Sequence, residues 1–280
     1  MNPPPKALAS AGLAVDQRPA AVAGIAGAGR SLGGLHAVPV REAAASHWLA
    51  EAVYRGFEIL AALTGLVAGL PLMLIAAAAI RCDSPGPVLF FHQRPGRSMA
   101  VRGRDLKGRR DLHPPPGGFE ADRLYYVPSY FTLVKFRTMY NDAPTRFPQF
   151  YAYKYTPEGF RRHYPTLQHD PRVTRAGRVL RMTSVDELPN LWSVLAGDLR
   201  LAGPRPEAPE VVQYYTPDDM YKFASKPGIT GLAQINGRGL LNWGETLAFD
   251  LHYVRTRSVG LDLKIIFMTL KRVLTRHGAF

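Results

Sequence analysis

The sequence predicts an α+β, monotopic membrane protein, in which a re-entrant N-terminal helix precedes a small helix-rich cytoplasmic domain with a short sheet. Three observations predict this fold: an apolar run from Phe57 to Ile80, strand patterns at 87–92 and 132–139, and a basic amphipathic segment at 261–274. The apolar run has 24 residues and one acid, Glu58, at its edge. As a helix it is long enough to cross a hydrocarbon core of roughly 30 Å.

The first predicted segment is a disordered tail at residues 1–40. It contains Pro3, Pro4 and Pro5 among scattered Ala and Gly, and no continuous apolar core follows the early Lys6. A secretory signal is therefore not predicted. Residues 41–83 are predicted as an amphipathic lead-in and a membrane helix broken at Pro71, and residues 84–280 as the domain on the cytoplasmic face.

Proline and charge together predict the re-entrant path. Pro71 lies near the middle of the apolar run, where it removes one backbone hydrogen bond and bends a helix. A helix that turns back there keeps both ends on the cytoplasmic side, which positive charge prefers. A simple crossing and a buried soluble helix stay open as alternatives. The flanking basic residues are Arg41, Arg55, Arg81, Arg94 and Arg97.

Bulk charge points to polyanionic partners. The formal net charge of the 280-residue chain is +13, which suits nucleic acid, anionic lipid or phosphorylated substrates, although solubility alone can explain a basic surface. A Pro- and Arg-rich stretch at 97–130 has loop composition and lacks interleaved aromatic residues, so nucleic acid is disfavoured. Cys82 is the only cysteine, which excludes a disulfide framework and fits a reducing, cytoplasm-facing location.

The C-terminal amphipathic segment, 261–274, has two open interpretations. It could lie in the bilayer interface with its basic side chains at the headgroups, or pack its apolar face against the protein's own core. Its basic side chains are Lys264, Lys271, Arg272 and Arg276, opposite Ile265, Phe267, Met268 and Leu270.

The second strand pattern points two cations in one direction. Alternation along 132–139 places Lys135 and Arg137 on one face, with Val134 and Phe136 on the other. Such a pair suits a phosphate site, and a solvated strand face explains it equally well.

An adjacent acid pair, Asp186 and Glu187, opens a predicted short helix that Gly197 ends. Ser184 could be its N-cap, but Pro189 then falls where a backbone N–H is needed, so Asp186 is the predicted cap. The apolar face of this helix consists of Leu188, Leu191, Trp192 and Leu195.

Downstream, Pro204-Arg205-Pro206 presents a guanidinium on a stiff turn. Acids followed by this arginine suggest a site for phosphate and a divalent cation, although Asp186 could be only a cap. No P-loop, GxGxxG or DxD pattern is present. The turn-rich segment 226–238 adds three polar groups, Gln234, Asn236 and Arg238.

Four long motifs resemble one family: KFRTM at 135–139, the stretch 170–207 around SVDELPN, KPGITGLAQINGR at 226–238 and 249–267. Their order and spacing over about 54–276 are similar to the bacterial sugar transferases, the monotopic phosphoglycosyl transferases, of the small catalytic-core type. The resemblance implies transfer of a sugar 1-phosphate from a nucleotide diphosphate sugar, usually a UDP-sugar, to polyprenyl (undecaprenyl) phosphate, with Mg²⁺ present and UMP released. A phosphosugar-aspartyl intermediate is expected. Such transfer initiates exopolysaccharide, capsule, O-antigen or glycoprotein glycan synthesis.

The resemblance also implies residue roles. Asp186 matches the nucleophile and Glu187 its partner, both near the metal, and Asp250 matches a nearby acid. Gln234, Asn236 and Arg238 are expected nucleotide or sugar contacts. The basic positions expected near the diphosphate are Lys135, Arg137, Arg181 and Arg205.

Setting and partners follow from the same resemblance. The expected location is the cytoplasmic face of the bacterial inner membrane, with the bilayer, downstream glycosyltransferases and a second copy of the chain as partners to consider. Two departures stand out: Leu70 replaces the serine that often precedes the family's helix-breaking proline, and a basic insert occupies about 101–131. A competing hypothesis is a non-catalytic membrane-surface protein that binds anionic lipid or partner enzymes. The sequence leaves the sugar and the glycan pathway open.

Overall fold

The structure is a computed structural model that describes residues 35–39, 48–109, 112–115, 117–151, 155–163, 170–237 and 240–275. Most of the predicted disordered tail and the lead-in at 41–47 lie outside these residues. The end of the predicted tail is not disordered, because Leu35–His36 (β1) and Val38–Pro39 (β2) are strands. Their anchor includes Pro39, whose carbonyl accepts a 2.8 Å hydrogen bond from the Tyr221 hydroxyl.

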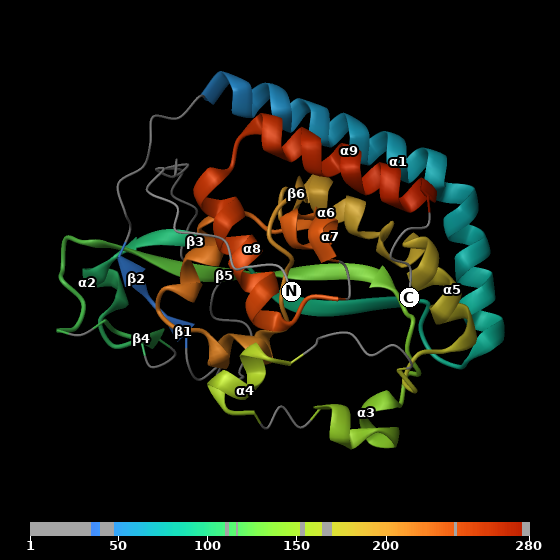
Figure 1. The fold of residues 1–280 in the computed structure, drawn as a ribbon, viewed down its shortest axis with the longest axis horizontal. Coiled ribbons are helices and arrows are strands. Elements are labelled where there is room, and N and C mark those ends of the chain that lie inside the picture. The colour runs from blue at the N-terminus through green and yellow to red at the C-terminus, as the bar shows by residue number, and fades with distance from the viewer. Residues whose placement is uncertain are drawn as a thin grey trace, which may run out of the picture.

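The apolar segment forms one helix, α1, from Trp48 to Asp83. Figure 1 shows α1 running beside α9 (Val259–Thr275) and then turning down beside α5 (Arg175–Thr183). Pro71 lies inside this continuous helix, so the helix is not broken there as predicted; Figure 1 shows that α1 bends along its length. In the described chain, α1 is the helix long and apolar enough to cross a membrane. Its exposed large apolar side chains are Trp48, Leu49, Val53, Phe57, Ile59, Leu60, Leu63, Val67, Leu70, Leu72, Leu74 and Ile75.

A long antiparallel hairpin forms one layer of the domain, and short helices pack on it. β3 (Leu89–Arg102) pairs with β5 (Leu124–Phe136) from Leu89↔Phe136 to Arg102↔Leu124, with a bulge between Pro95 and Ser98. β2 pairs with the other edge of β5. The loop prediction for 97–130 was therefore wrong at both ends, which are strand.

The predicted basic insert extends this hairpin. It contains α2 (Gly103–Leu106) and β4 (Leu112–His113), and β4 pairs in parallel with β1. Leu106, Leu112 and Tyr125 are buried and join the main core. A few well-placed apolar side chains thus fold a segment whose Pro- and Arg-rich composition is typical of a loop.

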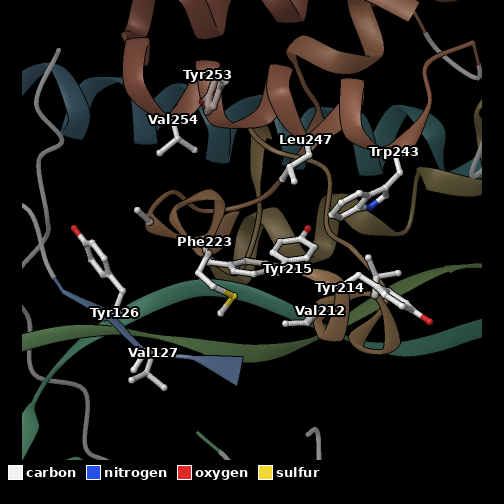
Figure 2. Close-up of a cluster of buried hydrophobic side chains, with 14 of the residues drawn as sticks. Tyr126, Val127, Val212, Tyr214, Tyr215, Phe223, Trp243, Leu247, Tyr253 and Val254 are labelled. Atoms are coloured by element: carbon white, nitrogen blue, oxygen red, sulfur yellow. The ribbon is translucent and has the colours of Figure 1, made fainter. Parts of the chain in front are cut away.

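Short helices cover the hairpin and carry the rest of the core. Figure 2 shows Tyr215 and Phe223 between Trp243 and Leu247 of α8 and the hairpin residue Val127. Phe160 stacks on Tyr214 with ring centroids 4.3 Å apart. The remaining elements are α3 (Ala143–Arg146), η2 (Pro148–Tyr151), α4 (Pro157–Arg161), α5 (Arg175–Thr183), η3 (Val185–Glu187), α6 (Asn190–Ala196), β6 (Arg200–Ala202), η4 (Pro209–Tyr214), η5 (Asp219–Ala224), β7 (Gly228–Thr230), α7 (Leu232–Gly237), α8 (Trp243–Thr256) and α9 (Val259–Thr275).

Both interpretations of the C-terminal amphipathic segment find support in α9. Ile265 is fully buried in the main core, and Thr269 pairs with Thr230 of β7 at 2.7 Å. Phe267 and Leu270 are exposed on the other side, and α9 lies beside α1 (Figure 1). The helix therefore packs against the core and still presents an apolar face. Arg276 lies outside the described residues.

Candidate active site

The acid pair lies on a tight turn between two helices. Thr174 caps α5 by accepting the Gly177 N–H at 3.0 Å, and α5 ends at Ser184, whose φ of 59° is left-handed. The chain then makes one 3-10 turn, η3, that contains Asp186 and Glu187. Val185 of this turn packs with Ile80 of α1. The turn that carries the acid pair therefore packs against the second half of α1.

The predicted helix register was wrong. α6 begins at Asn190 with Pro189 as its N-cap, so neither Asp186 nor Ser184 caps this helix. Proline fits there because the first helical turn needs no N–H from it. Leu188, which follows η3, and Leu191 of α6 approach α1 at Gly69 and Gly65, whereas Trp192 of α6 is 65% exposed.

Three cations surround Asp186. Lys135 comes from the end of β5, Arg181 from α5 and Arg205 from the turn after β6. Burial and the neighbouring Glu187 raise the pKa of Asp186 to about 6, while the three cations lower it. Asp186 is therefore mostly ionised at neutral pH, although it is only 6% exposed. Three cations against two acids leave positive charge for a phosphate.

Each cation has its own support. The Arg181 Nε donates to Thr138 Oγ1 at 2.9 Å, and Arg205 Nη1 lies 3.6 Å from Glu187 Oε1. Burial lowers the pKa of Lys135 to about 8, against the opposing charge of Asp186. Lys135 therefore titrates close to neutral pH, which is rare for a lysine.

The structure separates Arg137 from these cations. Its guanidinium is buried and donates to Ser84 Oγ and to the carbonyls of Ser84 and Pro87, at 2.6 to 2.8 Å. These bonds join the end of α1 to the hairpin. Arg137 therefore has a structural role at the C-terminal end of α1. It does not share a strand face with Lys135 as predicted, because β5 ends at Phe136, before Arg137.

The predicted nearby acid, Asp250, belongs to a buried charge cluster near the Arg205 turn. It is fully buried on α8, 2.9 Å from Lys222 Nζ, which also lies 2.9 Å from Glu207 Oε1. The backbone N–H of Arg205 is among the groups that lower the pKa of Asp250, which burial raises to about 6. Asp250 therefore lies near the Arg205 backbone, and among the described residues no hydrogen bond or ion pair joins it to the acid pair.

Sequence reasoning missed two supporting residues. Lys222 was identifiable as a lone lysine in the apolar run MYKFA. Asp83 ends α1 and accepts the Ala176 N–H at 3.0 Å, so it joins α1 to the start of α5. No periodic pattern marks Asp83, because its partner lies 93 positions away.

The polar groups of 226–238 make local bonds. Asn236 Nδ2 donates to the Leu232 carbonyl at 2.7 Å, and Gln234 Nε2 donates to the Ile229 carbonyl at 3.4 Å. Arg238 lies outside the described residues. Within the described part of the chain, no hydrogen bond or ion pair joins this segment to the acid pair.

The sequence is similar to those of several known proteins. The chain is 35% identical over 237 residues to an undecaprenyl-phosphate glucose phosphotransferase of Komagataeibacter xylinus, covering 81% of this chain and 36% of that protein. It is 31% identical over 228 residues to the exopolysaccharide production protein ExoY of Sinorhizobium fredii, covering 81% and 87%. A UDP-glucose:undecaprenyl-phosphate glucose-1-phosphate transferase of Caulobacter vibrioides is 35% identical over 240 residues, covering 81% and 71%.

The chain therefore spans about a third of the Komagataeibacter protein and most of the Sinorhizobium one. The family model described as bacterial sugar transferase matches residues 49–102 and 113–276. These two ranges include α1, the hairpin strands, the acid pair and all three cations around it. The chain belongs to the bacterial sugar transferase family.

Proposed function

We propose that the protein transfers a sugar 1-phosphate from a UDP-sugar to undecaprenyl phosphate, with release of UMP, and so begins the assembly of a bacterial glycan such as an exopolysaccharide. The observation that carries this proposal is a buried, largely ionised Asp186 surrounded by Lys135, Arg181 and Arg205 beside an apolar helix. The names of the relatives supply the substrate classes.

In the proposed reaction, the Asp186 carboxylate attacks the sugar-bearing phosphorus of the donor. The bond from that phosphorus to the UMP oxygen breaks, and UMP leaves with the electron pair. An oxygen of undecaprenyl phosphate then attacks the phosphorus of the phosphosugar-aspartyl intermediate, and the Asp186 carboxylate leaves. A carboxylate nucleophile divides one transfer into two easier steps, and phosphoryl transfer depends mainly on positioning and charge neutralisation.

The acid pair also fits Mg²⁺. Among the described residues, no group of three or more His, Cys, Asp or Glu side chains could hold a metal ion. Mg²⁺ commonly takes one or two protein carboxylates and completes its shell with substrate phosphates and water. Asp186 and Glu187 supply those carboxylates, and the ion would neutralise charge on the donor diphosphate.

Membrane attachment is the second part of the proposal. The exposed apolar side chains of α1, with Trp192, Phe267 and Leu270, suit a bilayer interface. With α1 bent and both ends on the cytoplasmic side of the inner membrane, the acid pair against α1 can meet a soluble donor and a lipid acceptor together.

The central test is Asp186→Asn. We expect this variant to lose UMP release from UDP-sugars while it still fractionates with membranes, and Asp198→Asn, which changes an exposed carboxylate outside the site, to retain it. Full turnover by Asp186→Asn would exclude Asp186 as nucleophile. A wild-type protein that binds anionic lipid but cleaves no sugar nucleotide would favour the non-catalytic alternative.

Labelled donor distinguishes the two-step route from a direct transfer. Donor carrying ³²P in the phosphate next to the sugar, supplied without acceptor, should label wild-type protein and leave Asp186→Asn unlabelled. Adding undecaprenyl phosphate should remove the label. UMP release without any labelled protein would indicate direct transfer in a ternary complex instead.

A further inference from the structure

An aromatic pair on β3 lies beside the phosphate-binding cations and has no role in the proposed chemistry. Phe90 is 39% exposed, and its ring centroid lies 5.6 Å from that of His92. The two residues are two positions apart on one strand, so both side chains leave the same face of the hairpin. A surface pair of rings at this place suits a flat ligand.

The cross-strand register joins this pair to the active site. Phe90 is directly opposite Lys135, and the Lys135 ammonium lies 6.0 Å from the Phe90 ring centroid. The charge of Lys135 acts on Asp186 and Glu187 on one side and on His92 on the other. Because only 6.0 Å separates the Lys135 ammonium from the Phe90 ring centroid, a single nucleotide can place its phosphate at Lys135 and its base at Phe90.

The tautomer of His92 follows from its hydrogen bond. His92 Nδ1 lies 2.7 Å from the Gln93 carbonyl oxygen, which can only accept, so Nδ1 carries a proton. Burial and the neighbouring Arg94 lower the pKa of His92, so the ring is neutral at pH 7. In a neutral ring with Nδ1 protonated, Nε2 is an acceptor.

We propose that Phe90 and His92 form the base subsite for the donor nucleotide, with the Phe90 ring stacked on a uracil and His92 Nε2 accepting the uracil imide N–H. The inference deepens the proposed function and rests on it. Uracil presents a donor at that ring position and cytosine presents an acceptor, so the subsite favours uracil. Stacking on an aromatic ring holds bases of every kind, whereas the edge hydrogen bond selects among them.

Equilibrium binding without turnover tests this subsite. The probes are UMP, CMP and ribose 5-phosphate, titrated into detergent-solubilised protein without donor or lipid acceptor. Wild-type protein should bind UMP roughly tenfold or more tightly than ribose 5-phosphate, and more tightly than CMP. Phe90→Ala should weaken the binding of UMP and of CMP by roughly tenfold or more and leave the affinity for ribose 5-phosphate unchanged. His92→Ala should remove the preference for UMP over CMP.

Phe91→Ala is the matched control. Phe91 is the next residue on β3, 60% exposed, and its side chain leaves the opposite face of the strand. The Phe91→Ala variant should bind all three probes as the wild type does. In each variant, unchanged binding of ribose 5-phosphate shows that the protein is folded. Equal affinities for UMP and ribose 5-phosphate, or equal effects of Phe90→Ala and Phe91→Ala on UMP, would overturn the proposal.

A role for Phe90 in lipid contact predicts a different result. Phe90→Ala would then reduce membrane retention and leave UMP affinity unchanged, which also overturns the base subsite. Because these titrations use no donor and measure no product, they are independent of the Asp186→Asn assay. Failure of the base subsite and failure of the proposed reaction are thus distinguishable.

Discussion

Arg205 Nη1 lies 3.6 Å from Glu187 Oε1, so the turn after β6 delivers its cation to the acid pair after α5. The Arg205 side chain is 48% exposed and the Glu187 side chain 24%. Solvent screening makes an ion pair of this kind worth little to folding stability. We therefore expect the pair to place a positive charge for the proposed chemistry rather than to stabilise the fold.

Arg205→Ala should lower kcat/KM for sugar-phosphate transfer by about 10²–10³-fold, as expected for a lost charge-stabilising donor. The free energy of unfolding should change by less than about 0.5 kcal/mol. The kcat/KM of Arg205→Lys should lie between those of the wild type and Arg205→Ala, because lysine keeps the charge but lacks the planar guanidinium. The matched control is Arg123→Ala, which breaks an exposed ion pair with Glu120 and should leave kcat/KM unchanged. Equal losses in both alanine variants would contradict this assignment.

The activity should have a bell-shaped pH profile. Asp186 must be ionised to attack, and its pKa is raised to about 6, so kcat/KM should fall as the pH drops through 6. Lys135 must be protonated to hold phosphate, and its pKa is lowered to about 8, so kcat/KM should also fall as the pH rises through 8. The two limbs belong to the coupled cluster of charges around Asp186.

Lys135→Arg separates the limbs. Arginine stays protonated at every pH used, so the basic limb should move upward while the acidic limb stays near 6. A basic limb unchanged by this substitution would show that Lys135 does not set it. The measurement is kcat/KM for the donor between pH 5 and about 9.5, the range in which carboxylate and perturbed lysine side chains titrate.

Gly177 sets the approach of α5 to the hairpin. A Cβ at this position would overlap the carbonyl oxygen of Thr138, the residue whose hydroxyl accepts from Arg181. Gly177→Ala should therefore destabilise the protein by about 1–3 kcal/mol and lower kcat through the displaced Arg181. Gly56→Ala, in a helix position with no atom within 4 Å, should be neutral or slightly stabilising. A Gly177→Ala variant as stable and active as Gly56→Ala would contradict the close approach.

Local pattern predicted much of this molecule. Apolar length predicted α1, and alternation predicted strands at 87–92 and 132–139, because these features need only neighbouring residues. The ends of the elements escaped prediction, since Tyr125 and Leu106 turn a loop-like segment into hairpin through distant contacts. Asp186 was predicted as the cap of the following helix, but the left-handed Ser184 ends α5 and places the acid pair on a separate turn, η3.

Arg137 shows the same limit at the site. Sequence alternation paired it with Lys135, but its side chain donates hydrogen bonds to Ser84 and Pro87, which are 53 and 50 positions away. Asp83 escaped notice for that reason too, because its partner Ala176 lies 93 positions away. Residue type and spacing indicated the proposed nucleophile Asp186 and the cations near it, whereas the residues that support them are visible only once the chain is folded.

Cys82 makes the membrane path of α1 measurable. It is the only cysteine of the chain and is exposed at the end of α1. A re-entrant helix places both ends of α1 on the cytoplasmic side, so a membrane-impermeant maleimide should label Cys82 in inverted vesicles and spare it in intact spheroplasts. Leu49→Cys in a Cys82→Ser background should behave in the same way. Opposite labelling of the two sites would show that α1 crosses the membrane.

The buried charge cluster of Lys222, Glu207 and Asp250 should affect both the stability and the activity of the protein. Lys222 is 2% exposed and lies 2.9 Å from both Glu207 and Asp250. Lys222→Met leaves these two acids buried without a cation, which should cost about 3–5 kcal/mol in the free energy of unfolding. Chemical denaturation in detergent micelles measures this loss.

A second substitution separates the lost cation from lost packing. Lys222→Met with Asp250→Asn removes one buried acid along with the lysine, and should recover a substantial part of the lost stability, because a deleted ion pair costs less than an unpaired charge. Transfer activity should stay low in this double variant, since the support beneath the Arg205 backbone is gone. In the Arg205→Ala background, Lys222→Met should then lower kcat/KM little further, because the two residues act as one unit. Independent, multiplying losses would instead mean that Lys222 does not act through Arg205.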